Sequence, residues 1–201
     1  MSNIKNIVFD FGGVLLEWNP HYLYDAYFGD VDKAEWFLTN ICTYPWNAQH
    51  DAGKPIAEGT AELIAKHPEW EKEIRMYYDG FETMMGGQIE GMEEYIKELK
   101  GRGFRIYGIS NWSSETFALI CNKYPILDLI ERKVISGEEK VMKPDARIFE
   151  IAMQRFESVP EECVFIDDNP DNIKAAEDFG IHGIRFFSAK QLKSELEQLL
   201  K

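Results

Sequence analysis

The sequence has few cysteines, no surplus of basic residues and no long apolar run. Its three cysteines, Cys42, Cys121 and Cys163, are widely spaced without a CxxC pair, which argues against a disulfide framework and a zinc site. No stretch has the apolar length that a membrane-spanning helix needs. The chain enters its first predicted strand almost at once, which leaves no room for a signal peptide. These absences predict a soluble, cytoplasmic protein with reduced thiols.

Acidic side chains clearly outnumber basic ones. The chain has 35 Asp and Glu against 22 Lys and Arg, a net charge of −13 and a pI of about 4.8. Such a surface repels polyanions, and no cluster of Lys and Arg offsets it, so nucleic acid is not expected as a partner. A site for an anionic substrate would need local compensation by a metal ion, a lysine or helix N-termini.

Beyond residue 86 the hydrophobic pattern alternates between strand-like runs and amphipathic helices. Pro144 and Pro170 are each placed in the first turn of a helix. Alternation of this kind predicts an α/β fold, with a doubly wound parallel sheet and helices on both faces. The length of 201 residues suits one domain with a large insertion, or one domain plus a small one. The strands are expected at 104–109, 133–136, 163–166 and 181–186.

Residues from about 17 to 78 differ in character, with many aromatic side chains and few strand-like alternations. Helical spacings occur there and prolines interrupt them, so we expect several short helices inserted after the first strand. The aromatic side chains are expected mainly to pack in a core rather than to line a ligand site. Gly86 and Gly87 are the predicted boundary of this insertion.

The first strand carries the first candidate for chemistry. An apolar run that begins at Ile4 ends abruptly in Asp10, which is followed by Gly12 and Gly13. A buried parallel strand delivers a carboxylate to its own carboxyl end in this way, and ligands of open α/β sheets bind at that edge. A turn or helix-capping carboxylate would give the same local pattern.

Polar residues also follow the later strands, and the carboxyl ends of parallel strands share one edge. Adjacent carboxylates there are costly unless a cation neutralises them, because like charges raise each other's pKa. Hard oxygen ligands of this kind suit Mg²⁺, which also binds substrate phosphate. The residues expected to meet are Asp10, Ser110 with Asn111, Lys143, and Asp167 with Asp168.

The segments VFDFGGVL, ISN, MKPD and VFIDDNPDN, in this order, resemble the four motifs of the haloacid dehalogenase superfamily. Its members are mostly phosphohydrolases with a Rossmann-like core. The resemblance implies a catalytic core at 1–16 and 87–201 and a helical cap at 17–86 that closes over the site. It is greatest to the branch of sugar-phosphate phosphatases, such as α-glucose-1-phosphate phosphatase, and of the phosphatase domain of soluble epoxide hydrolases.

The resemblance also implies roles for the residues of the first three motifs. Asp10 would be the nucleophile that forms an aspartyl-phosphate. Ser110 would donate a hydrogen bond to the transferring phosphoryl group, with Asn111 beside it. Lys143 would balance the negative charge of Asp10 and of the bound phosphate.

A magnesium site is implied in the same way. The metal would be held by Asp10, by the backbone carbonyl of Gly12 and by Asp168, with Asp167 in a supporting position. The expected substrate is a small phosphorylated metabolite, with neither nucleic acid nor membrane as partner.

Gly12 departs from the family pattern, which has a second Asp at this position as general acid and base. That step contributes typically about 10²–10⁴-fold to the rate. Three interpretations follow: a phosphatase with an acidic leaving group or another proton donor, for which Glu17, His50 and Asp51 are candidates; a metal-independent dehalogenase; or a non-catalytic phosphate-binding protein. The retained acidic pair favours a cation and hence the phosphatase.

The segment WNAQHDAGKPI, residues 46–56, resembles the cap loop that faces the catalytic pocket in this superfamily. We expect Trp46, His50 or Asp51 to touch the substrate. The alternative is an ordinary exposed turn between two helices, in which Gly53 reverses the chain.

Overall fold

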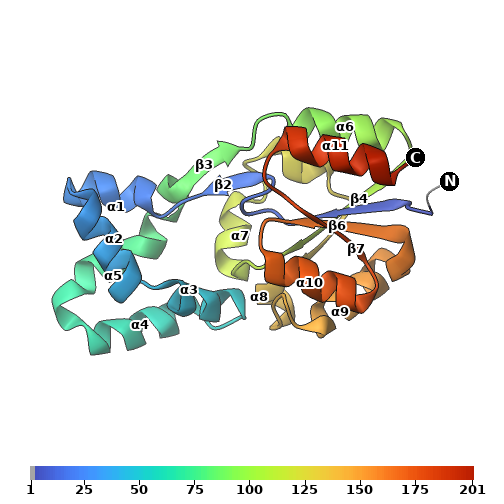
Figure 1. Ribbon diagram of the computed structural model, residues 1–201. Helices are drawn as coiled ribbons and strands as arrows, with labels where there is room; N and C mark the ends of the chain where they lie inside the picture. The colour runs from blue at the N-terminus through green and yellow to red at the C-terminus, as the bar shows by residue number, and fades with distance from the viewer. Residues whose placement is uncertain (1–2) are drawn as a thin grey trace.

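The computed structural model describes residues 3–201, which contain a five-stranded parallel sheet with helices on both faces (Figure 1). The chain adds strands on one side of β1 and then on the other, so the strand order reverses at β1. The predicted doubly wound, Rossmann-like parallel sheet is therefore confirmed. In spatial order the strands are β5 (Arg132–Ile135), β4 (Arg105–Ser110), β1 (Asn6–Phe9), β6 (Cys163–Asp167) and β7 (His182–Arg185).

The central strand β1 is buried along its whole length. Ile7 and Phe9 pack in the core on one face of the sheet, and Val8 packs in the core on the other. A parallel strand covered on both faces needs apolar residues at successive positions, which explains the uninterrupted run in the sequence. The first face is covered by α6 (Met92–Gly101) and α11 (Ala189–Leu199), and the second by α9 (Ala146–Phe156) and α10 (Pro170–Phe179).

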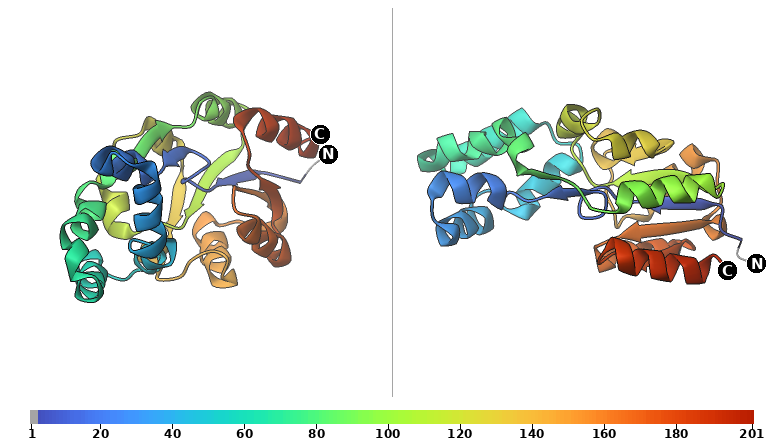
Figure 2. Two further views of the ribbon diagram at one scale, coloured as in Figure 1. Left: turned by 60° about the vertical axis from the view of Figure 1, so that its left-hand side comes forward. Right: turned by 90° about the horizontal axis from the view of Figure 1, so that it is seen from above.

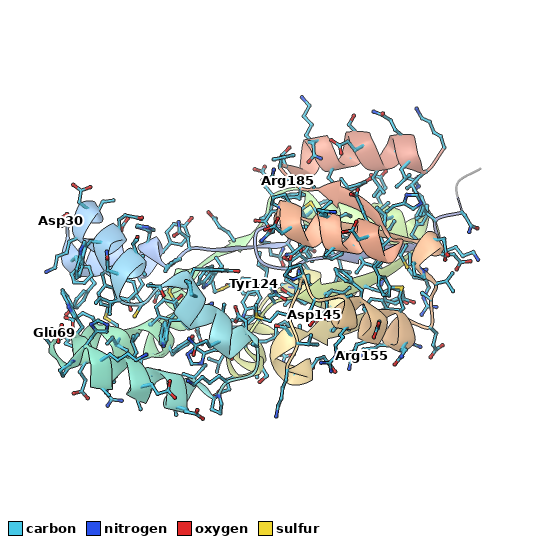
Figure 3. All side chains as sticks on the ribbon, turned by 60° about the horizontal axis from the view of Figure 1, so that its bottom comes forward. Asp30, Glu69, Tyr124, Asp145, Arg155 and Arg185 are labelled. Carbon is cyan, nitrogen blue, oxygen red and sulfur yellow. The ribbon has the colours of Figure 1, made fainter. Side chains whose placement is uncertain are left out.

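The start of α9 differs from the prediction. Pro144 precedes the helix, and Asp145 is the N-cap, whose side chain accepts a hydrogen bond from the Arg147 N–H at 2.9 Å (Figure 3). The capping carboxylate, rather than the proline, sets where the helix begins. Pro170 does lie in the first turn of α10, as predicted. Shorter core elements are α7 (Ser114–Ile120), α8 (Ser136–Glu139), and the 3-10 helices η3 (Pro125–Leu129) and η4 (Pro160–Glu162).

Short helices lie between β1 and α6, as predicted, but a strand pair joins them to the core. The strands β2 (Leu16–Trp18) and β3 (Met85–Gln88) are antiparallel neighbours. Only helices lie between these two strands, and the boundary expected at Gly86 and Gly87 falls inside β3 rather than after it. The helices are α1 (His21–Phe28), α2 (Val31–Asn40), α3 (Tyr44–Asp51), α4 (Ile56–Lys66), α5 (Glu71–Asp79), η1 (Pro68–Trp70) and η2 (Phe81–Met84).

The helical insertion forms a lobe at one end of the sheet, away from both chain termini (Figure 2). Its aromatic residues form a core around Tyr24, Phe37 and Trp46, which are buried, whereas Trp36 and Tyr44 are exposed. The predicted aromatic core is thus present but does not include every aromatic side chain. No helix among residues 3–201 is long and apolar enough to cross a membrane.

Candidate active site

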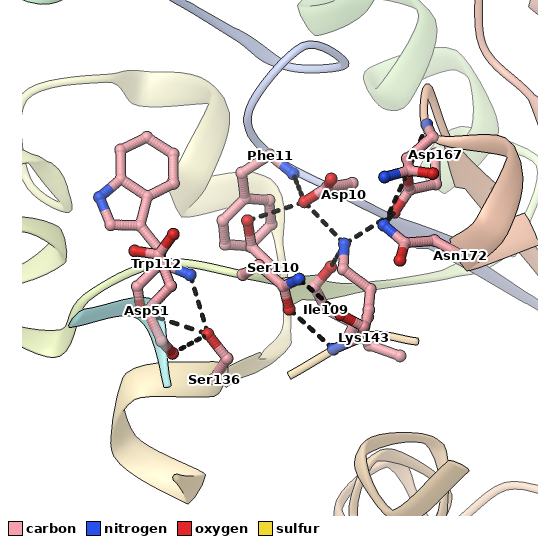
Figure 4. A network of polar contacts seen from close by, with 12 residues as sticks. Asp10, Phe11, Asp51, Ile109, Ser110, Trp112, Ser136, Lys143, Asp167 and Asn172 are labelled. Carbon is pink, nitrogen blue, oxygen red and sulfur yellow. Dashed lines mark hydrogen bonds and ion pairs between the residues drawn. The ribbon is translucent and has the colours of Figure 1, made fainter. Parts of the chain in front are cut away.

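The polar residues that the sequence places at strand ends do meet at one edge of the sheet (Figure 4). Asp10 follows β1, Ser110 ends β4 and Asp167 ends β6, while Lys143 reaches them from the loop before α9. Their neighbours Gly12, Asn111 and Asp168 line a cavity of about 340 Å³, as do Asp10 and Ser110. The opposite wall of this cavity belongs to the helical lobe.

One oxygen of the Asp10 carboxylate is held by several donors. Oδ1 accepts hydrogen bonds from the Phe11 N–H at 2.7 Å and the Ser110 hydroxyl at 2.7 Å, and lies 3.0 Å from Lys143 Nζ. Within the described chain these donors all bind Oδ1. This leaves Oδ2 as the oxygen available for reaction, on a side chain whose orientation is fixed.

Lys143 is a buried cation between two carboxylates. Its ammonium donates to the Ile109 carbonyl at 2.8 Å and to Asp167 Oδ2 at 2.7 Å, in addition to its contact with Asp10. These acceptors match the three N–H directions of an ammonium. Burial alone would lower the pKa of Lys143, but the two carboxylates raise it by more, so the side chain stays charged.

Asp167 is fully buried and completely satisfied. Besides the Lys143 contact, its carboxylate accepts from the Asn169 N–H at 2.8 Å and from Asn172 Nδ2, which is 3.1 Å from both oxygens. A carboxylate with this many donors is a rigid acceptor that orients Lys143. The geometry suits the supporting position expected for Asp167.

Asp168 points to the cavity beside Gly13. Gly13 has a φ of +77°, and a Cβ at this position would lie 2.8 Å from Asp168 Oδ2, so only glycine leaves room for the carboxylate. The Asp168 backbone carbonyl accepts a hydrogen bond from Arg185 Nε at 3.0 Å. Burial, and then the charge of Asp167, raises the pKa of the Asp168 side chain.

These carboxylates fit a divalent cation. Asp10, Asp167 and Asp168 each offer an oxygen, and these oxygens lie within 4.8 Å of one another. Burial raises the pKa of Asp10 to about 7, the charge of Asp167 adds to this, and Lys143 opposes it. Hard oxygen donors with a surplus of negative charge are the set that Mg²⁺ takes, and Gly12 is among the residues that line the cavity.

Asn111 has a structural task in this arrangement. Its Nδ2 donates to the Lys143 carbonyl at 2.9 Å, and its Oδ1 accepts from the Lys143 N–H at 2.8 Å. This reciprocal pair fixes the backbone that carries the buried lysine. The contact of Asn111 with substrate, which the sequence suggested, stays a prediction, as do the substrate contacts of Ser110 and Lys143.

Comparison with known proteins identifies the family. The family model for haloacid dehalogenase-like hydrolases matches residues 4–180. The chain belongs to this family. This hydrolase is 24% identical to the sesquiterpene phosphatase astK of Aspergillus oryzae over 208 residues, which cover 99% of this chain and 98% of the relative. It is 21% identical to the D-ribitol-5-phosphate phosphatase of Bacteroides thetaiotaomicron over 209 residues, which cover 98% of each chain.

Solved structures share the fold of this hydrolase. The magnesium complex of a haloacid dehalogenase family enzyme from Bacteroides thetaiotaomicron has a TM-score of 0.75 at 20% identity, covering 98% of this chain and 100% of the other. The L-2-haloacid dehalogenase from Xanthobacter autotrophicus has a TM-score of 0.66 at 16% identity, covering 97% and 83%. Other relatives match about half of this chain, which spans at most 45% of their length.

The lobe of this hydrolase contributes one of the predicted loop residues to the cavity. Asp51 lines it, whereas Trp46 and His50 do not. Trp46 donates from Nε1 to the Gly59 carbonyl at 3.1 Å, and His50 Nδ1 lies 3.1 Å from the Lys54 carbonyl, so both rings pack inside the lobe. The His50 ring packs on Gly59 of α4, where a Cβ would lie 2.1 Å from His50 Cε1.

The other expectations for the lobe are met only in part. Gly53 does reverse the chain, with a φ of +94°, but the turn packs against Gly137 and Lys140 of the core rather than standing exposed. Glu17 does not line the cavity; it accepts a hydrogen bond from the Tyr22 hydroxyl on the surface. Among the three candidate proton donors, Asp51 therefore shares the cavity with Asp10.

Sequence reasoning missed several residues that line the cavity. Asn172 was visible in the segment VFIDDNPDN, but its contact with Asp167 depends on the first turn of α10. For the other lining residues, which are aromatic or polar, nothing in the sequence indicates a place in the cavity, because tertiary packing alone decides which side chains face it. They are Trp18, Tyr44, Asn47, Phe81, Trp112, Thr116 and Asn169.

Proposed function

We propose that this hydrolase is a magnesium-dependent phosphatase that acts on a small phosphomonoester of a sugar or polyol through an aspartyl-phosphate on Asp10. The observation that carries the proposal is the state of Asp10: Oδ1 is held by Phe11, Ser110 and Lys143, while Oδ2 remains for attack. An oriented carboxylate of this kind is a nucleophile for phosphoryl transfer.

The reaction then has two displacements at phosphorus. In the first, Asp10 Oδ2 forms a bond to phosphorus while the bond to the ester oxygen breaks, and that oxygen needs a proton. In the second, water attacks the acyl-phosphate, which releases phosphate and restores the carboxylate. Lys143 favours the ionised form of Asp10, and Ser110 limits its rotation.

Asp10, Asp168 and the Gly12 carbonyl would hold the magnesium ion. When bound, the ion supplies positive charge that stabilises the phosphoryl oxygens in the transition state. The charges of the site support this assignment, because the acidic cluster has one lysine to balance it. The magnesium complex of a structural relative and the two phosphatase relatives are consistent with it.

The cavity wall indicates the class of leaving group. Its lining side chains include no Lys or Arg, so a second phosphate or a carboxylate on the substrate would find no basic partner among the described residues that line the cavity. The carboxyl of Asp51 adds a polar group to this wall, and Trp18 and Trp112 contribute aromatic rings. This combination favours a neutral polyol or sugar over a terpene chain, which cannot use the polar groups.

The same electrostatics disfavour dehalogenation. A 2-haloacid carries a carboxylate, which would have to approach the acidic cluster, and the reaction requires no cation. Removal of metal separates the two functions, since chelation stops the phosphatase and leaves a dehalogenase active.

The test is a screen of phosphorylated metabolites with magnesium, with EDTA, and with magnesium restored. D-ribitol 5-phosphate, sugar 1-phosphates, an isoprenyl monophosphate and a bisphosphate would span the leaving groups. We expect turnover of polyol or sugar monophosphates that EDTA abolishes and magnesium restores. Turnover of 2-chloropropionate with EDTA present, or turnover that Asp10→Asn leaves intact, would contradict the proposal.

A further inference from the structure

Gly12 leaves the site without a side chain that could move the proton to the leaving oxygen. The cavity has carboxyl groups at Asp10, Asp168 and Asp51. Asp10 is the nucleophile of the proposed reaction and Asp168 lies in the acidic cluster at the sheet edge. Asp51 is the carboxyl group that enters from the opposite wall, where the leaving alcohol must lie.

Asp51 is anchored to both parts of the molecule. Its carboxyl accepts a hydrogen bond from Asn47 Nδ2 at 3.2 Å within the lobe, and another from the Ser113 backbone N–H of the core. Its backbone carbonyl accepts from the Ser136 hydroxyl at 2.5 Å, also in the core (Figure 4). The end of α3 is thus fixed over the cavity rather than free in solvent.

Further hydrogen bonds hold the residues that anchor Asp51. Asn47 is itself oriented by the Tyr78 hydroxyl, which donates to Asn47 Oδ1 at 3.0 Å. Ser136 is fully buried and also accepts from the Trp112 N–H at 2.9 Å. A carboxyl that served only to solubilise the surface would need no such support.

The protonation behaviour of Asp51 agrees with its position. Burial raises the pKa of Asp51 to about 7, although the Ser113 N–H opposes the change. A carboxyl group with this pKa can both donate and accept a proton near neutral pH. Tyr44, the other titratable side chain on this wall, is largely exposed to solvent, and a phenol is too weak an acid to be a good proton donor near neutral pH.

We propose that Asp51 is the general acid and base of this hydrolase, in place of the side chain that Gly12 lacks. The proposal rests on the proposed phosphatase function. In the first displacement the protonated Asp51 gives its proton to the ester oxygen as the bond from that oxygen to phosphorus breaks. In the second, the Asp51 carboxylate takes a proton from the water that attacks phosphorus, so that Asp10 leaves as a carboxylate and both side chains return to their initial states.

The test compares Asp51→Asn with wild type on two substrates, D-ribitol 5-phosphate and p-nitrophenyl phosphate, each with magnesium. Asn keeps an acceptor oxygen for Asn47 and Ser113 but cannot transfer a proton. Asp79→Asn is the matched control, because Asp79 is an exposed carboxylate at the end of α5. Wild-type turnover that Asp10→Asn abolishes tests the phosphatase function separately.

We expect Asp51→Asn to lower kcat for D-ribitol 5-phosphate by about 10²–10³-fold. p-Nitrophenolate needs no proton to leave, so the first displacement should stay fast while hydrolysis of the acyl-phosphate slows. The variant should then release a burst of one nitrophenolate per active site and accumulate chain phosphorylated at Asp10, which mass spectrometry detects. The control variant should behave as wild type.

Equal losses on both substrates without a burst would overturn the proposal, because a merely structural role does not distinguish leaving groups. Unchanged turnover of D-ribitol 5-phosphate would overturn it as well. If Asp51→Asn does not fold, Asp51→Glu takes its place: it retains a carboxyl group at a displaced position, and the proposal requires a larger loss for D-ribitol 5-phosphate than for p-nitrophenyl phosphate.

Discussion

The substitution Asp51→Asn should stabilise the metal-free protein at alkaline pH while it damages catalysis. A carboxyl group whose pKa rises on folding is costly to ionise in the folded state, whereas an amide has no charge to bury. The amide oxygen of the new Asn side chain can still accept the hydrogen bonds from Asn47 and Ser113. Stability gained by removing a functional group is the usual sign of a site optimised for activity.

The linkage between proton binding and folding gives the sign and the size of the effect of Asp51 on the free energy of unfolding. The pKa of Asp51 rises from 3.8 to about 7 on folding, so the folded chain binds the proton more tightly and stability falls as pH rises between these values. At about 1.36 kcal/mol for each tenfold change in the proton equilibrium, the full cost above pH 7 is about 4 kcal/mol. Roughly 2–3 kcal/mol of this cost develops between pH 5 and pH 8.

The assay is urea denaturation of wild type, Asp51→Asn and Asp79→Asn at pH 5 and pH 8, in EDTA. The raised pKa of Asp10 is common to all three proteins and cancels in the differences. We expect the free energy of unfolding of Asp51→Asn, relative to wild type, to increase by about 2–3 kcal/mol from pH 5 to pH 8. A difference that does not change with pH, or one of opposite sign, would refute the assigned burial of this carboxyl group.

Four further predictions concern the core of the site. Asp10→Asn should abolish turnover while the thermal midpoint stays at or above that of wild type, as measured by steady-state kinetics and circular dichroism, because the amide is no nucleophile but relieves a buried charge. Gly13→Ala should weaken magnesium binding in calorimetry by at least tenfold, since the new Cβ would meet Asp168 Oδ2; unaltered affinity would show that Asp168 is not a ligand. Lys143→Met should lower the free energy of unfolding by about 3–5 kcal/mol, because it leaves Asp10 and Asp167 buried without their partner. Asn172→Ala should reduce kcat about tenfold with little change in KM, because Asp167 would lose a donor to both oxygens and orient Lys143 less well; a change confined to KM would argue for direct contact with substrate.

The sequence predicted the sheet and its acidic edge because both follow from short-range pattern. An apolar run that stops at Asp10, and another that stops at Asp167, need no knowledge of distant contacts to be recognised as strands with functional ends. Parallel order then brings Lys143 and Ser110 to the same edge. The resemblance to the family supplied the roles of these residues, which the pattern alone could not.

The lobe was harder to predict, for physical reasons. Gly86 and Gly87 have low strand propensity, so nothing local reveals that they lie in a strand beside β2; Gly87 pairs with Glu17, about seventy residues away. Similarly, Asp51 and His50 are adjacent in sequence, and only the packing of α3 decides that the carboxyl faces the cavity while the imidazole turns inward. Tertiary contacts, not composition, select the lining residues.

The pairing of β2 with β3 means that the lobe leaves the core and returns to it at a single point. The two strands that connect the lobe to the core lie side by side, so the inserted helices take the place that the loop has in a β-hairpin. The entropic cost of closing an inserted segment grows only slowly with its length, so a longer or shorter lobe would change the stability of the core little. Grafting a foreign lobe onto this ribbon should thus leave the sheet intact, and the new lobe would bring its own substrate contacts and would have to supply a proton donor in place of Asp51.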